Sequence, residues 1–287
     1  MRVDGHTLLY GLIGFPVSHT RSPAMLNAAF EALGMDAAYL PFEVHPGRLA
    51  EGVRGMSAIG VKGFNVTIPH KRAVIDYLDS VSDEAAVIGA VNTVLVDGDS
   101  LRGENTDGRG FVRALEADLG FGIEGATTFI LGAGGGGRAI GVMSAIHGAA
   151  EIRVADIDRG RALDLAETIN SKVRPGLCRT VRLGGDELRA ALEDVDLFVD
   201  ATPLGLKPGD EASIDVGLLD RDAVVYDLVY NPPVTKLIAE ARGAGLKAEN
   251  GMGMLLHQGA IAFELWTGMD PPVEVMRAAL EKNMGQP

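Results

Sequence analysis

The sequence contains a single cysteine, Cys178, which excludes an internal disulfide framework and any zinc site built from several cysteines. Basic residues are also few: 26 Lys and Arg stand against 39 Asp and Glu, a formal net charge of 26 − 39 = −13. This deficit argues against a nucleic-acid partner or an anionic membrane surface, because both bind clustered Lys and Arg. A small anionic substrate stays open, because it needs only one or two local cations.

Long apolar runs are absent as well. No stretch reaches the length of a membrane span, and residues 1–6 lack the apolar core of a signal peptide. We therefore expect a cytoplasmic protein without membrane contact, either a monomer or a homodimer. The length of 287 residues corresponds to about two domains of roughly 150 residues each.

Glycine, by contrast, is abundant. The 38 glycines are close to twice the usual share, and most stand singly at the ends of apolar runs. Such positions suit short turns between strands and helices, where positive φ or close backbone approach is required. The chain also alternates strand-like and helix-like segments. Together these features predict an α/β fold with a parallel sheet covered by helices on both faces.

The pattern of expected strands and helices changes at Asp107. Before it we expect strands at 8–13, 38–43, 64–68 and 91–96, a hairpin turn at 97–98 with a return strand to Glu104, and helices at 22–33 and 47–59. After it we expect strands at 127–131, 152–155, 197–201 and 224–228, and helices at 107–119, 138–147 and 158–170. Two last helices, at about 252–267 and 272–284, follow the end of the alternation.

A dense glycine cluster follows the predicted strand 127–131 and precedes a helix. Its Gly-x-Gly-x-x-Gly spacing is typical of dinucleotide sites: the first glycine permits a tight turn, the second close approach of a pyrophosphate, and the third close helix packing. The helix N-terminus would offer free N–H groups to the phosphates. The predicted cofactor residues here are Gly132, Ala133, Gly134, Gly135, Gly136, Gly137 and Arg138.

The next strand ends at Asp156, which lies 156 − 137 = 19 residues after Gly137, close to the ~20 of the dinucleotide fingerprint. A carboxylate there can accept both ribose hydroxyls of NAD and would repel the 2′-phosphate of NADP. This predicts NAD as the preferred cofactor. The alternative is that Asp156 caps the following helix, a role for which Asp158 is also available.

Four polar residues stand where a core or a turn is expected. Lys71 follows a strand and Pro69, either as a catalytic group or as surface charge. Asn92 interrupts an apolar strand and needs hydrogen-bond partners if it is buried. Asp107 either lines a cleft or caps its helix. Gln258 lies on an otherwise apolar helix, either bonded to backbone or contacting substrate.

The loop 18–22 is rich in hydroxyls, which suits a polyhydroxylated ligand. Ser22 also suits the N-cap of a helix with Pro23 at its first position. His257 belongs to no spaced set of metal ligands, so no metal site is predicted.

Seven segments, in order along the chain, resemble motifs of the shikimate dehydrogenase family. They are residues 11–23 (GLIGFPVSHTRSP), 65–71 (NVTIPHK), 89–93 (GAVNT), 105–108 (NTDG), 200–205 (DATPLG), 226–232 (YDLVYNP) and 251–258 (GMGMLLHQ). The resemblance implies a substrate domain of residues 1–106 plus 251–287, a Rossmann-type NAD(P) domain of residues 107–250, and a cleft between them. It also implies reversible hydride transfer between a nicotinamide cofactor and C3 of shikimate.

The resemblance assigns roles to individual residues. It implies that Lys71 is the acid/base and Asp107 its partner. The implied substrate-binding residues are Thr20, Ser22, Thr67, Asn92, Asp107, Tyr230 and Gln258. The cofactor-binding set gains Thr202, Pro203, Val229 and Gly251.

Two departures from the family pattern bear on specificity. Thr20 and Ser22 stand where the family usually has two serines, and members that also oxidise quinate vary at this pair. Residues 155–157 read Ala-Asp-Ile where NADP-type members usually carry Asn-Arg-Thr, so the chain is more similar to NAD-linked quinate/shikimate dehydrogenases. The alternatives are a one-carbon-folate dehydrogenase of related fold and a non-catalytic dinucleotide-sensing regulator, although a sensor needs neither Lys71 nor Asp107.

Overall fold

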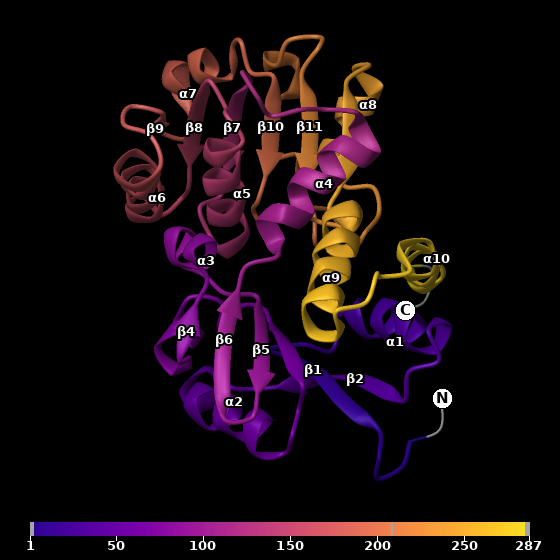
Figure 1. The fold of residues 1–287 in the computed structure, drawn as a ribbon. Coiled ribbons are helices and arrows are strands. Elements are labelled where there is room, and N and C mark those ends of the chain that lie inside the picture. The colour runs from indigo at the N-terminus through magenta and orange to yellow at the C-terminus, as the bar shows by residue number, and fades with distance from the viewer. Residues whose placement is uncertain (1–2, 208, 285–287) are drawn as a thin grey trace. The chain divides into compact units, whose positions relative to one another are not determined.

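The structure, a computed structural model, describes residues 3–207 and 209–284. It divides into two compact units: residues 1–110 with 255–287, and residues 111–254 (Figure 1). Two helices, α4 (Asp107–Leu119) and α9 (Met252–Thr267), carry the chain from one unit to the other. The division therefore lies inside these helices, a few residues beyond each boundary proposed from the sequence.

The first unit contains a mixed six-stranded sheet with the order β2-β1-β3-β5-β6-β4. β1 is parallel to both β2 and β3, whereas β5 is antiparallel to both β3 and β6. The predicted hairpin is confirmed, with Gly98 at φ 58° in the turn between β5 and β6. The strands are β1 (Leu8–Gly14), β2 (Ala37–Glu43), β3 (Gly63–Val66), β4 (Ser80–Val81), β5 (Thr93–Asp97) and β6 (Ser100–Glu104).

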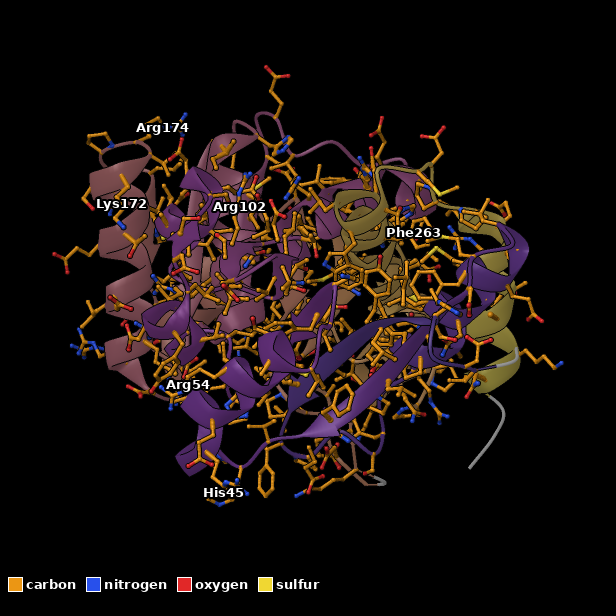
Figure 2. All side chains as sticks on the ribbon, turned by 60° about the horizontal axis from the view of Figure 1, so that its bottom comes forward. His45, Arg54, Arg102, Lys172, Arg174 and Phe263 are labelled. Carbon is orange, nitrogen blue, oxygen red and sulfur yellow. The ribbon has the colours of Figure 1, made fainter. Side chains whose placement is uncertain are left out.

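Helices cover both faces of this sheet, because successive side chains of a strand point to opposite sides. On β1, Tyr10 packs among residues of α1, α9 and α10, whereas Ile13 packs among residues of α2. Phe263 of α9 is fully buried in the first of these cores (Figure 2), and burial of such a side chain contributes about 1.5–3 kcal/mol. The helices are α1 (Ser22–Ala32), η1 (Pro46–Arg48), α2 (Leu49–Ala58), η2 (Ala73–Tyr77), α3 (Asp83–Ile88) and α10 (Val273–Met284).

The second unit contains a parallel six-stranded sheet with the order β12-β11-β10-β7-β8-β9. Counted from β7, this is the 3-2-1-4-5-6 order of dinucleotide-binding folds. The strands are β7 (Thr127–Leu131), β8 (Glu151–Ala155), β9 (Cys178–Thr180), β10 (Leu197–Asp200), β11 (Val224–Asp227) and β12 (Lys247–Asn250).

The predicted helices on both faces of the parallel sheet are confirmed. On one face Phe129 and Phe198 stack with ring centroids 5.7 Å apart, in a core completed by α7 (Gly185–Leu192), η3 (Val216–Leu218) and α8 (Lys236–Gly243). On the other face Ile130 lies beside α5 (Gly135–Ile146) and α6 (Arg159–Lys172).

Several expected boundaries were wrong. β3 ends at Val66 rather than Ile68, because the next residue, Thr67, accepts the N–H of His70 in a turn at 2.9 Å. β5 begins at Thr93, which leaves Asn92 just before the strand. α5 begins at Gly135, three positions before the expected Arg138. The short elements β4, α3, β9, α7, α8 and β12 were not predicted.

Within residues 3–207 and 209–284, no helix combines the length and the apolar composition needed to cross a bilayer. In the same part of the chain, no three or more His, Cys, Asp or Glu side chains are grouped as metal ligands would be.

Candidate active site

Lys71 and Asp107 form an ion pair in the first unit. Lys71 follows the turn after β3, and its carbonyl accepts the N–H of Val91 at 2.7 Å. Asp107 is the first residue of α4. The distance from Lys71 Nζ to Asp107 Oδ2 is 2.7 Å, and the two side chains are 18% and 7% exposed. The pair is therefore shielded, yet the lysine can still be reached.

Asp107 is available for this pairing because another residue caps α4. Asn105 Oδ1 accepts the backbone N–H of Asp107 at 3.1 Å and that of Gly108 at 3.3 Å. Asn105 is itself held through Nδ2, which donates to the Ala90 carbonyl at 3.0 Å. The interpretation of Asp107 as the helix cap is thus wrong, because Asn105 satisfies the first N–H groups of the helix.

Asn92 holds the second oxygen of the Asp107 carboxylate. Asn92 Nδ2 donates to Asp107 Oδ1 at 2.9 Å, and Asn92 Oδ1 accepts the N–H of Thr106 at 2.7 Å. The side chain is 2% exposed, so both ends of its amide are satisfied inside the protein. The carboxylate is consequently held by Lys71 on one oxygen and by Asn92 on the other.

Gln258 of α9 joins this cluster. Its Oε1 accepts a bond from Asn92 Nδ2 at 3.3 Å, while its Nε2 donates to the Leu255 carbonyl at 2.8 Å. A Cβ on Gly110 would lie 2.6 Å from the Gln258 nitrogen, so only glycine permits this approach of α4 and α9. The interpretation of Gln258 as a buried residue bonded to backbone is confirmed, and its contact with substrate stays a prediction.

A buried chain of hydrogen bonds between hydroxyl and amide groups extends toward Ser22. The Tyr39 hydroxyl donates to Asn65 Oδ1 at 2.7 Å and is hydrogen-bonded to Ser22, while burial raises the pKa of Tyr39 well above its usual value. Asn65 Nδ2 donates to the Asn92 carbonyl at 3.1 Å and to Thr93 Oγ1 at 3.0 Å. Ser22 is thereby tied to the same cluster as Asn92.

Sequence reasoning missed Tyr39, and it misplaced Ser22 as a helix cap. α1 begins at Ser22 itself with Arg21 at the N-cap position, so the serine hydroxyl does not cap the helix. Thr20 and Thr67 are both partly exposed on loops of the same unit, and Thr20 Oγ1 lies 3.4 Å from the Ser22 nitrogen. A signal for Tyr39 was present, since it is a phenol on an otherwise apolar strand.

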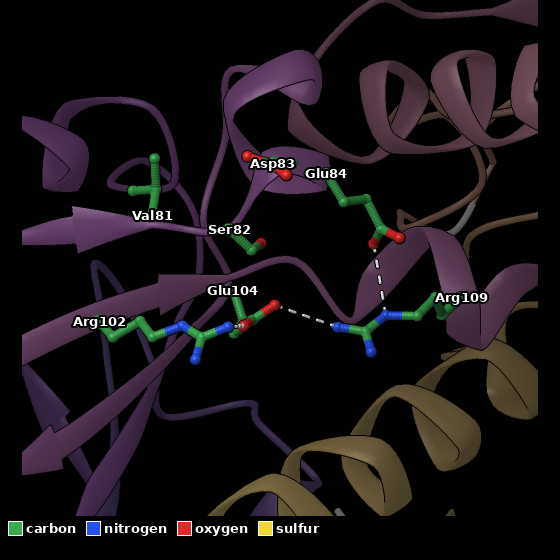
Figure 3. Close-up of a pocket in the computed structure, with 7 residues that line it drawn as sticks. All are labelled: Val81, Ser82, Asp83, Glu84, Arg102, Glu104 and Arg109. Atoms are coloured by element: carbon green, nitrogen blue, oxygen red, sulfur yellow. Dashed lines mark hydrogen bonds and ion pairs between the residues drawn. The ribbon is translucent and has the colours of Figure 1, made fainter.

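A second charged cluster surrounds the start of α4. Arg109 pairs with Glu84 of α3 and Glu104 of β6, each at 3.3 Å, and Arg102 pairs with Glu104 at 2.7 Å (Figure 3). These side chains line a polar pocket beside β4. Burial raises the pKa of Glu84, which the Arg109 cation opposes. The cluster ties α3 to α4, two residues beyond Asp107.

In the second unit, the glycine loop has the geometry that its spacing predicts. Gly132 has φ +100°, and a Cβ there would lie 2.8 Å from the Ala201 carbonyl oxygen. A Cβ on Gly137 would collide with the Gly132 carbonyl oxygen, whereas the Cβ position of Gly134 is open. The first helical bond of α5 runs from Arg138 to Gly134, so the glycine N–H groups before it have no intrahelical partner. The loop therefore suits a phosphate.

Asp156 lies beside this loop. Its Oδ2 accepts the N–H of Ala133 at 2.7 Å, and its Oδ1 accepts that of Asp158, also at 2.7 Å. Asp158 in turn caps α6 by accepting the Gly160 N–H at 3.0 Å. The interpretation of Asp156 as the helix cap is therefore wrong.

Arg138 contrasts with the rest of the predicted cofactor set. Its side chain is 4% exposed and binds Asp164 at 2.7 Å and Thr168 at 3.1 Å, both on α6. Its backbone N–H is used within α5. The arginine joins α5 to α6, and its assignment to the cofactor set stays a prediction.

The remaining predicted cofactor residues, Thr202, Pro203, Val229 and Gly251, follow the ends of β10, β11 and β12. In a parallel sheet these ends lie on the same edge as the glycine loop. Tyr230 follows Val229 and so belongs to the second unit, whereas the other predicted substrate residues belong to the first.

Comparison with known proteins agrees with this geometry. The model of the shikimate dehydrogenase substrate binding domain matches residues 12–94, and that of the shikimate 5′-dehydrogenase C-terminal domain matches residues 251–281. Shikimate dehydrogenase (NADP(+)) of Methanopyrus kandleri is 48% identical over 98% of both chains. The chain belongs to the shikimate dehydrogenase family. This confirms the resemblance and removes the folate-dehydrogenase alternative.

Solved shikimate dehydrogenase structures share the whole fold. One, in complex with NADP+, has a TM-score of 0.92 at 38% identity and covers 99% of this chain and 98% of its own. Another, shikimate 5-dehydrogenase from Listeria monocytogenes in complex with shikimate and NAD, has a TM-score of 0.90 at 38% identity and covers 98% of both chains. The expected pairing of a substrate domain with a Rossmann-type domain is thus confirmed for the family.

Proposed function

We propose that this protein oxidises shikimate reversibly to 3-dehydroshikimate by hydride transfer at C3, with NAD preferred as the acceptor. The observation that carries the proposal is the shielded ion pair between Lys71 and Asp107, 2.7 Å from Nζ to Oδ2, set in a network of amides and hydroxyls. A non-catalytic dinucleotide sensor would have no use for this pair.

Lys71 is the group that moves the proton. Hydride addition to a ketone leaves a developing alkoxide, which needs a donor within hydrogen-bond reach. An ammonium stabilises that charge and gives up its proton, and the Asp107 carboxylate fixes its position and favours its charged form. A bound nicotinamide supplies the hydride chemistry itself.

The substrate carboxylate and ring hydroxyls are held by polar side chains. Ser22 and Gln258 are fixed by internal bonds, so they can present their remaining donors and acceptors without reorganising. The amide of Asn92 is used inside the protein, so Asn92 contributes by holding the Asp107 carboxylate in place. Thr20, Thr67 and Tyr230 complete the proposed set. Such a site rejects a molecule that lacks one matching hydroxyl, because a buried polar partner is then left unpaired.

The preference for NAD rests on Asp156. Its carboxylate is anchored on the Ala133 N–H, beside the loop proposed to bind pyrophosphate, where a 2′-phosphate would add like charge. Neighbouring Ala155 and Ile157 offer no cation, and Arg161 is paired with Asp158 at 3.3 Å. The Methanopyrus relative is named for NADP(+) and the Listeria structure holds NAD, so both cofactors occur among relatives, and we attribute NAD preference in this chain to Asp156.

The deciding experiment follows the absorbance of reduced cofactor during oxidation of shikimate by the purified protein. We expect a higher kcat/KM with NAD than with NADP at saturating shikimate. A higher kcat/KM with NADP would overturn the role of Asp156, and no turnover with either cofactor would favour the sensor.

Quinate is a second candidate substrate. Thr20, in place of the usual serine, adds a methyl group to the loop that precedes α1, and quinate differs from shikimate at the ring carbon that bears the carboxylate. Repeating the assay with quinate and 3-dehydroquinate tests this directly.

A further inference from the structure

The carboxyl-terminal edge of the second unit's sheet repeats one hydrogen-bonded turn. At four strand ends a side-chain oxygen accepts the N–H of the residue two positions later, at 2.7–2.9 Å. The pairs are Asp156–Asp158, Asp200–Thr202, Asp227–Val229 and Asn250–Met252. Such turns fix the direction in which the chain leaves each strand.

Two of the four, Asp200 and Asp227, are buried carboxylates. Each is 1% exposed, and they are direct register partners on the adjacent parallel strands β10 and β11. Neighbouring strands are about 4.8 Å apart, so two like charges are placed side by side away from water. Burial of this kind opposes folding unless strong bonds offset it.

Asp227 accepts two hydrogen bonds, one on each oxygen of its carboxylate. The Val229 N–H donates to Oδ1 at 2.9 Å, and the Thr235 hydroxyl donates to Oδ2 at 2.5 Å. Thr235 Oγ1 also accepts the N–H of Ile238 at the start of α8, which directs its proton toward Asp227. Both partners are placed as donors, so an asparagine here would turn its NH₂ group toward one of them.

The surroundings oppose the ionised form of Asp227. Burial, with a smaller contribution from Asp200, raises the pKa of Asp227 to about 6, while Thr235 and Val229 act in the opposite direction. On the other side, β12 presents the uncharged Asn250 as the register partner of Asp227. A charge kept in such a place is typical of functional positions.

We propose that Asp227, supported by Asp200, is a positioning residue for the bound cofactor. The two carboxylates fix the turns that carry Thr202, Pro203 and Val229 and link one of them to α8. The inference rests on the proposed function, which assigns those three residues to the cofactor. Neither carboxylate touches the cofactor; each acts through the backbone that it holds.

The first test is Asp227→Asn, which keeps the shape but leaves one donor facing an amide NH₂. We expect the Kd of NADH, measured by its fluorescence, and the KM of NAD to rise about tenfold or more. The KM of shikimate should stay within about twofold. Asp196→Asn is the matched control, because Asp196 accepts the Thr127 N–H at 2.7 Å on the opposite edge of the sheet. It should leave the Kd unchanged.

The second readout is the pH dependence of NADH binding. Protonation of Asp227 turns one of its two acceptor oxygens into a hydroxyl and weakens the bonds that it accepts, so the wild-type Kd should rise as pH falls through about 6. Asp227→Asn should lack this rise, and Asp196→Asn should keep it. A Kd within twofold of wild type at neutral pH, or an unchanged pH dependence in Asp227→Asn, would overturn the inference.

Thr235 gives an independent pair of variants if Asp227→Asn does not fold. Thr235→Ser keeps the hydroxyl and should bind NADH as the wild type does, whereas Thr235→Val should weaken binding several-fold; equal binding by both would overturn the inference. Because binding is measured without turnover, a wild type that binds NADH but does not oxidise shikimate refutes the proposed substrate only. A wild type that binds no nicotinamide overturns both proposals.

Discussion

The two units build their candidate sites from different chemical groups: the first from side chains, the second from backbone. In the first unit, side chains bind side chains: Lys71 to Asp107, Asp107 to Asn92, and Asn92 to Gln258. In the second, side chains shape backbone: Asp156 holds the Ala133 N–H, and glycines expose the N–H groups of a helix start. Substitutions should therefore affect proton transfer in the first unit and cofactor binding in the second.

The strongest test of this division is Lys71→Ala. We expect kcat to fall by about 10²–10⁴, the range that general acid–base groups contribute, with little change in the Kd of NADH. Steady-state kinetics and NADH fluorescence separate the two effects. Lys62→Ala, an exposed lysine just before β3, is the control. A kcat near that of wild type would remove Lys71 from the mechanism.

Asp107→Asn should act in the same direction and less severely. The asparagine keeps one oxygen, but Lys71 and Asn92 both donate to the native carboxylate, so one of the two bonds is lost. We expect kcat to fall by about 10- to 100-fold. Asp99→Asn, in the exposed β5–β6 turn, makes the same charge change as a control. Equal kcat values for these two variants would contradict the role assigned to Asp107.

The corresponding test in the second unit is designed to change the cofactor preference and to leave hydride transfer itself unaltered. The triple variant Ala155→Asn, Asp156→Arg, Ile157→Thr removes a like charge and adds a bidentate partner for a phosphate. We expect the NAD/NADP ratio of kcat/KM to reverse by about tenfold or more. Asp186→Asn, at an exposed carboxylate in the first turn of α7, should leave the ratio unchanged. An unaltered ratio in the triple variant would show that another residue reads the ribose.

The smallest expected effect concerns ring selectivity in the first unit. Thr20→Ser removes a methyl group beside the proposed ring site, and Ser22→Thr adds one. Ser22 also forms a hydrogen bond with Tyr39. We expect the quinate-to-shikimate ratio of kcat/KM to shift by about 1 kcal/mol, or about fivefold. Ser100→Thr, at the exposed first residue of β6, serves as the control. Ratios unchanged in both variants would mean that this loop does not recognise the ring.

Much of this site could be predicted because its residues lie within short contiguous motifs. Lys71 and Asp107 were found through their neighbours in sequence, and the glycine loop through its spacing after a strand. The sequence left open whether Asp107 caps α4, because Asn105 and Asp107 both suit that role and only the hydrogen bonds distinguish them.

Other features depend on contacts between distant segments, which spacing does not encode. Arg138 follows the glycines in sequence, but its side chain pairs with Asp164 on α6. Tyr39 joins Ser22 to Asn65 across three separate elements. Short elements such as β4 and β9 were missed, since two or three residues are too few to establish a period.

Because α9 and α10 are the last helices to leave the ribosome, the two units become complete at different times during synthesis. The second unit is one continuous segment, residues 111–254, and can begin to fold as soon as it has emerged. The first unit lacks Phe263 and Met276 of its core, and the Gln258 partner of Asn92, until the final segment has been synthesised. The unit that begins first in translation is therefore the one completed last, and its exposed apolar face in the nascent chain is where protection by a chaperone would matter most.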